Sequence, residues 1–456
     1  MEFSTLTFLI FFFPLFLFSY FIFKKRSIRN LVLLIFSLFF YAWGEPIYIV
    51  LMLLSIVMNY YFAILIDKYN KKKLYLIISL ICNILLLVIF KYTDFLISIF
   101  NFIFRSDIAL TNIALPIGIS FYTFQILSYV IDVYRGKVNV QKNIIYLGCY
   151  ISAFPQLIAG PIVTYDTVEK ELSTRKESIS LFADGIRRFI IGLSKKILFA
   201  NSVGYIADSI FGLSITEWTF PLIWLAVLSY TLQIYFDFSG YSDMAIGMGK
   251  MLGFNYLENF NYPYISKSVT EFWRRWHISL STWFRDYVYI PLGGNRVNKR
   301  RLCLNIMIVW SLTGLWHGAS INYLLWGLYY GVILLIEKLL LNKYIEKWPN
   351  LLRHIYTITI FLFGWTIFRL ENFNELMVAF KSLFGFNGFG NLSMLISLGI
   401  FKIKYILFFM LSIIFCIPFK INIDKKLKDV LLLILLIFVI ANMVTGSYNP
   451  FIYFRF

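Results

Sequence analysis

Long apolar runs recur along the whole chain and are separated by short polar segments. Because about 20 apolar residues in a helix cross the roughly 30 Å hydrocarbon core of a bilayer, each such run is typical of a membrane-spanning helix. The candidate spans are Phe3–Phe23, Leu31–Trp43, Pro46–Ile66, Leu74–Phe90, Ile108–Ile131, Ile144–Val163, Phe182–Ile206, Glu217–Phe236, Leu302–Trp316, Ile321–Ile336, His354–Phe368, Ile403–Phe419 and Val430–Val444. The pattern predicts an all-α polytopic membrane protein with about eleven true spans and one or two re-entrant or interfacial helices.

Three of these segments need comment. Leu31–Trp43 is short, and Phe182–Ile206 carries four basic side chains, so we expect the latter to lie in the membrane interface. Phe3–Phe23 has no basic segment before it and no small-residue cleavage motif, and lysines follow it. It is therefore interpreted as a first transmembrane helix rather than a signal peptide. Since no soluble linker or internal repeat interrupts the pattern, we expect a single membrane domain over residues 1–456.

Composition and charge fit this interpretation. Hydrophobic residues make up 60% of the 456-residue chain and charged residues only 14%, whereas a soluble domain carries about a quarter charged residues. The formal net charge is +18, and the basic residues cluster in short segments such as Lys24-Lys25-Arg26 and Lys71-Lys72-Lys73. By the positive-inside rule these loops, and the stretch from Lys267 to Arg301, face the cytoplasm, which places the N-terminus outside the cytoplasmic (inner) membrane. No RNA- or DNA-binding signature accompanies the charge, so we expect membrane lipids and no nucleic acid as partners.

The four cysteines, Cys82, Cys149, Cys303 and Cys416, stand alone within apolar stretches. No Cys/His spacing suits zinc and no disulfide framework is indicated, so no metal site is expected.

His317 is the first candidate for chemistry. If the segment before it is helical, sixteen residues carry the chain about 24 Å from Arg301 to His317, well into the membrane. An ionisable residue at such a depth is costly and points to function. A desolvated neutral imidazole suits acyl transfer because it can take a proton from an attacking hydroxyl. The alternative is a histidine that only packs helices together.

His277 lies in a run of interleaved aromatic residues and arginines between Phe272 and Tyr287. One interpretation is an interfacial amphipathic helix of two to three turns, with arginines reaching the lipid phosphates. The other is a binding surface for an anionic donor such as the phosphates of a pantetheine thioester, with Arg274, Arg275 and Arg285 as fork-shaped donors. The third histidine, His354, follows Arg353 at the start of an apolar segment, where an interfacial structural role is expected.

Two carboxylates, Asp237 and Asp243, lie in a segment rich in hydroxyls and glycine directly after an apolar span. This composition suits non-helical backbone that lines a cavity, which membranes tolerate only where protein or water satisfies it. We expect Asp237 and Asp243 to pair with the arginine cluster or to orient a histidine, the alternative being a solvated loop. No GxSxG motif is present, so a self-contained serine hydrolase is not indicated.

Seven stretches, taken in order, resemble the membrane-bound O-acyltransferase (MBOAT) superfamily, and within it the bacterial branch of the alginate O-acetylation and D-alanyl transfer type. The stretches are Tyr41-Ala42-Trp43-Gly44-Glu45-Pro46, residues 116–125, residues 154–161, Asp237-Phe238-Ser239-Gly240-Tyr241-Ser242-Asp243, the Trp273–Trp283 run, Leu315-Trp316-His317-Gly318, and residues 449–456. Each stretch is weak by itself, but the ordered set covers nearly the whole chain and is highly specific.

The resemblance implies an MBOAT-type ring of about eleven transmembrane helices around a buried active-site histidine, His317. It implies that His277 is the second histidine, on the cytoplasmic side of the same core. Similar proteins take an acyl group from a cytoplasmic thioester and pass it outward. They work with a separate extracytoplasmic acyltransferase of the SGNH-hydrolase type.

We therefore expect vectorial O-acylation of a cell-surface or exported polysaccharide. The donor would be acetyl-CoA or an acyl carrier protein, used as substrate with no bound cofactor, and it would dock near Arg274, Arg275 and His277. His317 would act as general base or form an acyl-histidine, and Trp316 is included among the polar groups of the core. Acetyl is the default acyl group, whereas D-alanyl would require a cytoplasmic carrier protein as a partner. The rival functions are a transporter of the polymer or its lipid-linked precursor, and a non-catalytic scaffold of a polymer synthase.

Overall fold

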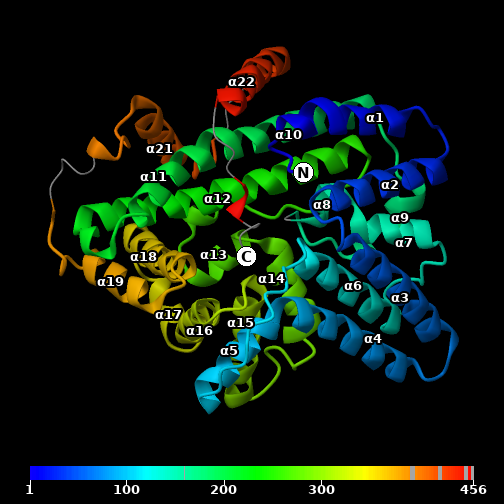
Figure 1. Ribbon diagram of the computed structural model, residues 1–456, viewed down its shortest axis with the longest axis horizontal. Coiled ribbons are helices and arrows are strands. Elements are labelled where there is room, and N and C mark those ends of the chain that lie inside the picture. The colour runs from blue at the N-terminus through cyan, green and yellow to red at the C-terminus, as the bar shows by residue number, and fades with distance from the viewer. Residues whose placement is uncertain (159, 391–395, 420–423, 446–449, 453–456) are drawn as a thin grey trace. The chain divides into compact units, whose positions relative to one another are not determined.

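A computed structural model describes residues 1–158, 160–390, 396–419, 424–445 and 450–452 of the chain. All regular elements in these ranges are helices, and no strand occurs among them (Figure 1). Eight helical segments of the described residues are long and apolar enough to cross a membrane: Arg26–Gly44, Ile49–Lys68, Lys72–Phe104, Ile179–Phe211, Phe220–Met251, Ile321–Ile345, Asn350–Arg369 and Lys425–Thr445. Thr7–Phe21 and Ile403–Phe415 are shorter apolar helices. The predicted all-α polytopic architecture is confirmed, and the count of about eleven spans stays a prediction.

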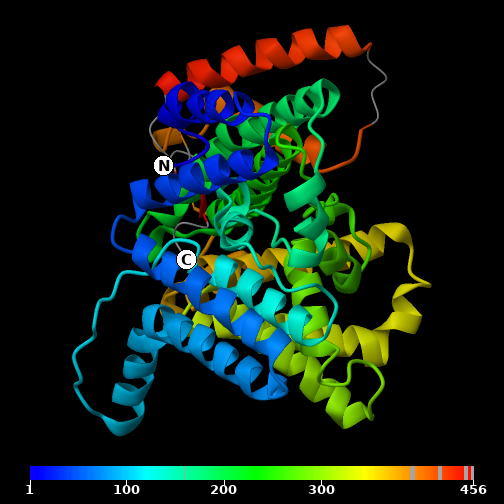
Figure 2. The same ribbon diagram turned by 90° about the vertical axis from the view of Figure 1, so that its right-hand side faces the viewer.

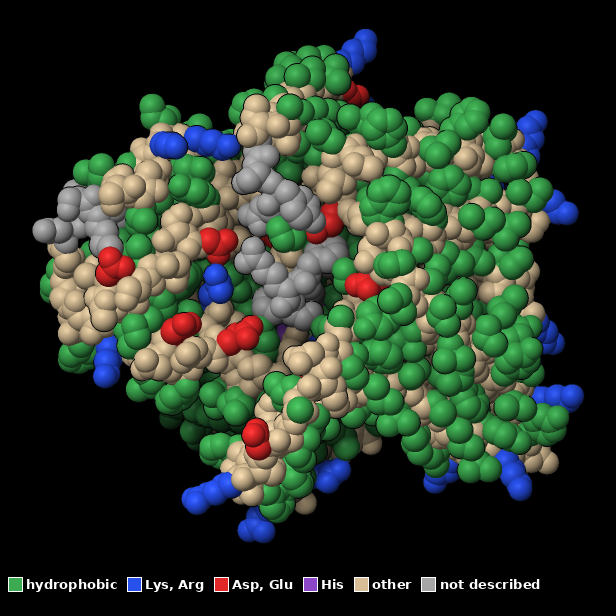
Figure 3. All heavy atoms as spheres, in the orientation of Figure 1, with side chains coloured by type: hydrophobic (Ala, Val, Ile, Leu, Met, Phe, Trp, Pro, Cys, Tyr) green, Lys and Arg blue, Asp and Glu red, His purple; other side chains and the backbone are tan. Residues whose placement is uncertain are grey.

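Hydrophobic side chains cover much of the surface visible in Figure 3. Helix α22 (Lys425–Thr445) is an example of such an apolar exposed surface. Leu432 and Val439 are buried, whereas residues such as Ile434 and Ile437 are about 60% exposed. In a bilayer such side chains face lipid tails, which are as apolar as leucine.

The chain divides into two compact units, and the first comprises residues 1–191 and 241–257. Its helices are η1 (Thr7–Phe12), α1 (Phe13–Phe21), α2 (Arg26–Gly44), α3 (Ile49–Lys68), α4 (Lys72–Leu87), η2 (Val88–Tyr92), α5 (Thr93–Phe104), α6 (Ile119–Tyr134), α7 (Ile144–Ser152), α8 (Phe154–Leu157), α9 (Tyr165–Thr174) and most of α10 (Ile179–Ser194). Helices α3 and α4 run side by side (Figures 1 and 2). The buried Asn59, Ser79 and Asn83 join them through hydrogen bonds of 2.8–3.0 Å, the kind of polar contact that links helices where lipid offers no partner.

Two predicted spans of the first unit are wrong in their bounds. The run Ile108–Ile131 becomes helical only at Ile119, where Gly118 adopts a left-handed φ of 75° and separates the helix from the preceding irregular segment. The run Ile144–Val163 breaks after Ser152, where Ala153 has a ψ of 111° and the short α8 carries Pro155 as its second residue. Proline has no backbone N–H, and its ring would clash with the carbonyl four residues earlier, so α7 cannot continue through this position as a single straight span.

The second unit comprises residues 192–240 and 258–456. Its helices are η3 (Lys195–Ala200), α11 (Asn201–Phe211), η4 (Ile215–Glu217), the first part of α12 (Phe220–Met251), η5 (Pro263–Ile265), α13 (Val269–Arg275), α14 (Ile278–Phe284), η6 (Arg285–Tyr289), α15 (Lys299–His317), α16 (Ile321–Ile336), η7 (Glu337–Leu341), α17 (Asn342–Ile345), α18 (Asn350–Arg369), α19 (Phe373–Leu383), α21 (Ile403–Phe415) and α22. Residues 179–211 form one helical segment of 33 residues that is apolar enough to span. This favours a span over the interfacial position that its basic residues suggested.

Helices α15 and α16 cross at two glycines. A Cβ on Gly314 would lie 2.2 Å from the backbone oxygen of Tyr323, and a Cβ on Gly327 would lie 2.2 Å from that of Trp310. Only glycine allows so close an approach of two backbones, as at other small-residue helix crossings in membranes. The crossing lies three residues before His317 and so fixes where that end of α15 sits.

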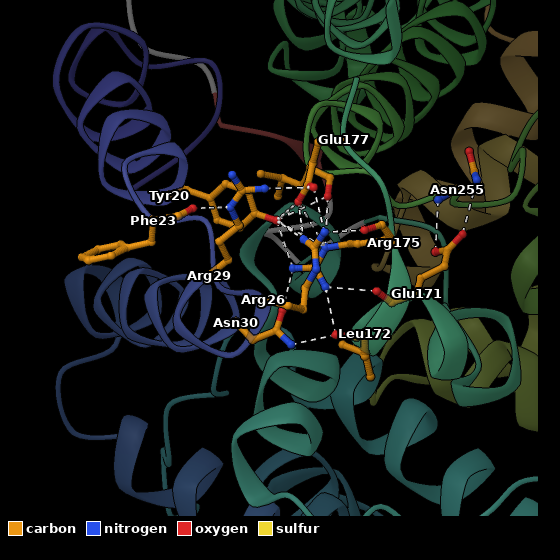
Figure 4. A network of polar contacts seen from close by, with 11 residues as sticks. Tyr20, Phe23, Arg26, Arg29, Asn30, Glu171, Leu172, Arg175, Glu177 and Asn255 are labelled. Atoms are coloured by element: carbon orange, nitrogen blue, oxygen red, sulfur yellow. Dashed lines mark hydrogen bonds and ion pairs between the residues drawn. The ribbon is translucent and has the colours of Figure 1, made fainter. Parts of the chain in front are cut away.

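A polar cluster ties α1, α2 and the α9–α10 connection together in the first unit (Figure 4). The Glu177 carboxylate accepts hydrogen bonds from Arg26 and from Tyr20 (2.8 Å), and pairs with Arg29 at 2.9 Å. The buried Arg175 guanidinium donates to Tyr20 (3.0 Å) and to Asn30 (2.6 Å). The one carboxylate thus pairs with Arg26 and Arg29, and the buried Arg175 is satisfied by neutral oxygens, as buried polar groups require.

We predict that Glu177→Gln destabilises the protein in a pH-dependent way. Burial alone raises the pKa of Glu177, but its hydrogen bonds to Arg26 and Tyr20 prevail and lower the pKa to about 2. A carboxyl whose folded pKa lies below its unfolded value adds stability above the unfolded pKa of about 4.3, and loses it as the pH falls toward the folded pKa. In detergent at pH 7 the variant should lose about 2 kcal/mol, and the gap should narrow below pH 4. A gap that stays constant between pH 7 and pH 3 in thermal unfolding would contradict this role.

Candidate functional site

A pocket of about 730 Å³ lies in the second unit, lined by residues of α13 to α18. Both His277 and His317 line it. The two imidazoles are buried, at 1% and 7% exposure, whereas Arg274, Arg285 and Lys338 on the same pocket are exposed. The pocket therefore reaches from a charged surface to buried histidines.

The helix that carries Arg274 and Arg275 is held at its start by one carboxylate and one serine. Ser268 caps α13 by accepting from the Glu271 N–H at 3.0 Å. The buried Glu337 accepts from the N–H groups of Val269 (2.7 Å) and Thr270 (2.8 Å). Negative groups at a helix N-terminus satisfy its unpaired N–H groups and its dipole. This contact anchors α13, and with it the pocket wall, to η7.

His277 marks a sharp break between α13 and α14, with a left-handed φ of 43°. Of the two interpretations of the aromatic and arginine run, the one that requires a single continuous helix is therefore wrong. For a residue with a side chain this backbone costs about 1–2 kcal/mol, and such strain collects at functional sites. The turn directs the imidazole inward, where Phe238 and Trp316 pack edge-on at ring-centroid distances of 4.6 and 5.8 Å.

The two nitrogens of the His277 imidazole differ in their polar neighbours. Its Nδ1 lies 3.2 Å from Asn259 Oδ1, whereas its buried Nε2 has no hydrogen-bond partner among the described residues. Burial lowers the pKa of His277 to about 3, because a low-dielectric surrounding disfavours the charged form. The ring is therefore neutral at physiological pH, with one nitrogen unoccupied at the pocket.

His317 is the last residue of α15, as the predicted helix from Arg301 requires. Trp326 of α16 and Phe368 of α18 pack edge-on against its ring at 5.0 and 5.2 Å. Trp316 lies beside both imidazoles, 4.9 Å from the ring of His317, but does not line the pocket. The depth of His317 in a membrane stays a prediction.

Two guanidinium groups of the pocket have no carboxylate to balance them. The side chains of Arg274 and Arg353 make no hydrogen bond or ion pair with any described residue, and Arg353 Nε is buried. Arg285 also lines the pocket but forms a two-pronged pair with Asp286 at 2.6 and 3.0 Å, and this hydrogen bonding raises its pKa. Unbalanced guanidiniums are suited to a carboxylate or a phosphate.

Among the described residues, the arginines and lysines that line the pocket differ from the predicted arginines by one residue lost and two gained: Arg275 is absent, and Lys338 and Arg353 are present. Arg275 does not line the pocket, because it pairs with Glu271 at 2.9 Å and donates to the Asn261 carbonyl at 3.1 Å. Lys338 and Arg353 line the pocket but did not enter the predicted site. Their sequence signals are weak, since each is a single basic residue at the edge of an apolar run. In the described part of the chain, four basic side chains and two acidic ones, Glu271 and Glu346, line the pocket.

The partners of the two predicted carboxylates, Asp237 and Asp243, are a lysine and an arginine outside the predicted arginine cluster. Both lie within the continuous helix α12, so the predicted non-helical backbone is wrong. Asp243 pairs with Arg188, and Asp237 pairs with the fully buried Lys196 at 2.6 Å. These ion pairs satisfy the two carboxylates inside the protein, which a cavity-lining loop was expected to do. The helix can therefore continue past Phe236.

The Lys196–Asp237 pair also binds a distant piece of chain. Asp237 accepts from the Ile452 N–H at 2.8 Å, and Lys196 donates to the Pro450 carbonyl at 2.9 Å. The ring of the buried Phe451 lies 4.4 Å from the Lys196 ammonium. The segment 450–452 is therefore held in the interior by a matched pair of charges. Other residues of the C-terminal stretch quoted above, 449 and 453–456, lie outside the described residues.

No group of three or more His, Cys, Asp or Glu side chains within the described ranges is placed to hold a metal ion.

A sequence model of the membrane-bound O-acyltransferase (MBOAT) family matches residues 139–378. A probable alginate O-acetylase from Pseudomonas aeruginosa is 42% identical over 394 residues, covering 85% of this chain and 75% of the relative. A peptidoglycan O-acetyltransferase from Helicobacter pylori is 34% identical over 423 residues, covering 85% and 80%. A teichoic acid D-alanyltransferase from Bacillus subtilis is 30% identical over 286 residues, covering 58% and 71%.

We predict that removing one member of the buried ion pair costs more than replacing both. Asp237→Ala leaves the Lys196 ammonium buried without its counter-charge and should cost about 3–5 kcal/mol, whereas the double variant Lys196→Met/Asp237→Leu should recover part of this loss. Thermal unfolding of the detergent-solubilised proteins measures the order. The half-exposed pair of Asp208 and Arg369 is the matched control, and Asp208→Ala should cost less than about 1 kcal/mol. A double variant as unstable as the single one would refute the expected coupling.

Proposed function

This chain belongs to the membrane-bound O-acyltransferase family and is a multi-pass membrane O-acyltransferase, and from that premise we propose which acyl group it moves, from what, and to what. The donor is an acyl thioester, acetyl-CoA or an acyl carrier protein, that reaches the protein from the cytoplasm. The acyl group, acetyl by default, passes outward for O-acylation of a cell-surface or exported polysaccharide. His317 is the active-site base.

The observation that carries the proposal is the pocket that unites His277 and His317 with unbalanced guanidiniums. Arg274 and Arg353 have no carboxylate partner among the described residues, so an anionic ligand would satisfy them. A thioester carried on a phosphorylated arm has charge at one end and its acyl group at the other. With phosphate at the exposed arginines, the acyl end would lie near the buried histidines.

The chemistry requires one base and balances with a single proton. The acceptor hydroxyl gives its proton to an imidazole nitrogen of His317, and its oxygen bonds to the thioester carbonyl carbon. The C–S bond then breaks, and the imidazolium returns the proton to the departing thiolate. The products are an O-acyl ester and a free thiol. The oxyanion formed in between needs a hydrogen-bond donor, for which an indole or backbone N–H is suited.

The acceptor is proposed from the relatives. The names of two of them specify O-acetylation of alginate and of peptidoglycan, and both polymers carry sugar hydroxyls outside the cytoplasm. We accordingly propose the inner membrane as the location, with the N-terminus outside. We also propose an extracytoplasmic SGNH-hydrolase-like acyltransferase as the partner that completes transfer, and a cytoplasmic carrier protein if the acyl group is D-alanyl.

We predict that His317→Ala abolishes polymer O-acylation without lowering polymer yield. Loss of the base should reduce ester content at least about 100-fold. Ester is measured by mild-alkali release and mass spectrometry in cells with wild-type protein, His317→Ala or no copy, at matched membrane levels. The mass of the released acid identifies the acyl group.

His354→Ala is the control for this experiment, because His354 bonds the Ser266 carbonyl at 3.3 Å and does not line the pocket. It should keep ester content near the wild-type value. Unchanged ester in His317→Ala would overturn the base assignment. Loss of polymer in the deletion alone would favour a transporter or a scaffold.

We further predict that Arg274→Ala weakens donor binding more than turnover. Removing a charge-assisted hydrogen bond costs about 1.5–3 kcal/mol, so the apparent KM for the thioester should rise about 10-fold or more while kcat changes little. Acyl transfer in membrane vesicles at varied donor concentration measures both constants. Arg300→Ala removes an equal charge from an exposed site off the pocket and should leave KM unchanged. Equal KM effects in the two variants would show a general charge effect instead of a donor site.

A further inference from the structure

The amide oxygen of Asn259 is surrounded by three groups that can donate to it. The Ser279 N–H lies 3.2 Å away, the Ser279 hydroxyl 2.9 Å away, and His277 Nδ1 3.2 Å away. A backbone N–H can only donate, so the atom facing it must be the amide oxygen and not the amide nitrogen. The orientation of the Asn259 side chain is thereby fixed by its neighbours.

This orientation decides the protonation state of the imidazole. An amide oxygen only accepts, so a hydrogen bond between it and His277 Nδ1 requires a proton on that nitrogen. The Ser279 hydroxyl also lies 3.4 Å from Nδ1, but it donates to the nearer Asn259 oxygen at 2.9 Å, which leaves Nδ1 as the donor. In a neutral ring the other nitrogen, Nε2, then holds a lone pair. That atom belongs to a side chain in a residue only 1% exposed, has no partner among the described residues, and is on a ring that lines the pocket.

We infer that Asn259 is a positioning residue that fixes His277 in its Nδ1-protonated form, so that Nε2 serves the pocket as a hydrogen-bond acceptor. The structure assigns Asn259 no contact with substrate, and it acts through His277. The inference on the protonated nitrogen is independent of the proposed function, whereas its consequence for acyl transfer rests on that function.

The segment that carries Asn259 also holds the backbone of His277. The Ile278 N–H donates to the Asn259 carbonyl at 3.0 Å, and the Asn261 N–H donates to the Arg275 carbonyl at 2.9 Å. These two bonds bracket the left-handed residue His277. One short segment therefore fixes both the strained turn and the tautomer of its side chain, which gives the pocket a preset acceptor.

An unprotonated His277 Nε2 at the pocket restricts which ligand groups can bind beside it. Nε2 can receive an N–H or an O–H but repels a carboxylate or phosphate oxygen. The anionic part of a ligand is thus directed to Arg274 and Arg353, and a hydrogen-bond donor to His277. Two sources fit: an amide N–H in the arm of the thioester, or the hydroxyl of the acceptor.

Nitrogen-15 NMR of histidine-labelled protein in detergent tests the tautomer without any assay of activity. The chain has only three histidines, and the signal of His277 is the one lost in His277→Gln. We expect the proton on Nδ1 and an unprotonated Nε2 in the wild type and in Asn259→Asp, which keeps an acceptor oxygen. Asn259→Leu should give a mixture of both tautomers. A proton on Nε2 in the wild type overturns the inference, and that spectrum decides even if Asn259→Leu does not fold.

A double-mutant cycle tests the consequence for transfer. Asn259→Leu should reduce acyl transfer about 10-fold in the wild type and cause no further loss in a His277→Gln background, because the effect passes through His277. An equal loss in both backgrounds would mean a structural role for Asn259 alone and overturn the assignment.

The kinetic constants of Asn259→Leu identify the group that His277 binds. A rise in the donor KM identifies the amide N–H in the arm of the thioester, and a fall in kcat identifies the acceptor O–H. If the wild type transfers no acyl group from a thioester, the proposed function fails, while the NMR result still decides the tautomer.

Discussion

The constraint on which this structure depends is that a polar group buried in a membrane protein must find a partner inside the protein, since lipid supplies none. The described residues meet it with matched charges: Asp237 with Lys196, Asp243 with Arg188, and Glu177 with Arg26. These pairs make it possible for long apolar helices such as α10 and α12 to carry charges without breaking. They also tie distant segments together, as Lys196 and Asp237 do with residues 450–452.

Where the rule is not met by the protein itself, a ligand is the natural partner. Arg353 Nε and His277 Nε2 are buried atoms of residues that line one pocket, and the described residues leave both without a hydrogen-bond partner; the exposed Arg274 lines the same pocket. They differ in what they require, because the guanidiniums call for an anion and the imidazole nitrogen for a hydrogen-bond donor. A pocket that runs from an exposed cation to buried imidazoles suits a ligand with a charged end and a neutral end. That polarity is the physical basis on which we propose an acyl thioester as the ligand.

Two features of the backbone bring the pocket groups together. The glycine crossing of α15 and α16 fixes the end of α15, where His317 lies. The left-handed turn at His277 reverses the chain between two short helices and directs the imidazole inward. Neither feature is rigid by its own local preference, since glycine is flexible and the turn is strained. Packing against aromatic rings and bonds from the segment 259–261 hold them in place.

The sequence by itself determined that the chain is an all-α membrane protein of the O-acyltransferase family, because apolar run length and ordered motifs are local properties. It singled out His277, His317, Arg274 and Arg285 as candidates, and the structure places all four on one pocket. Only the tertiary structure decided that Arg275 forms an ion pair with Glu271 and does not line the pocket. It also decided that Asp237 and Asp243 lie in a helix with lysine and arginine partners. Lys338 and Arg353 were placed on the pocket by the structure alone. The same holds for Asn259, which lies 18 residues from His277 in the chain. The reason is physical. A polar side chain is structural or available to a ligand according to which groups from distant segments lie within about 3 Å of it. No local sequence pattern encodes those neighbours.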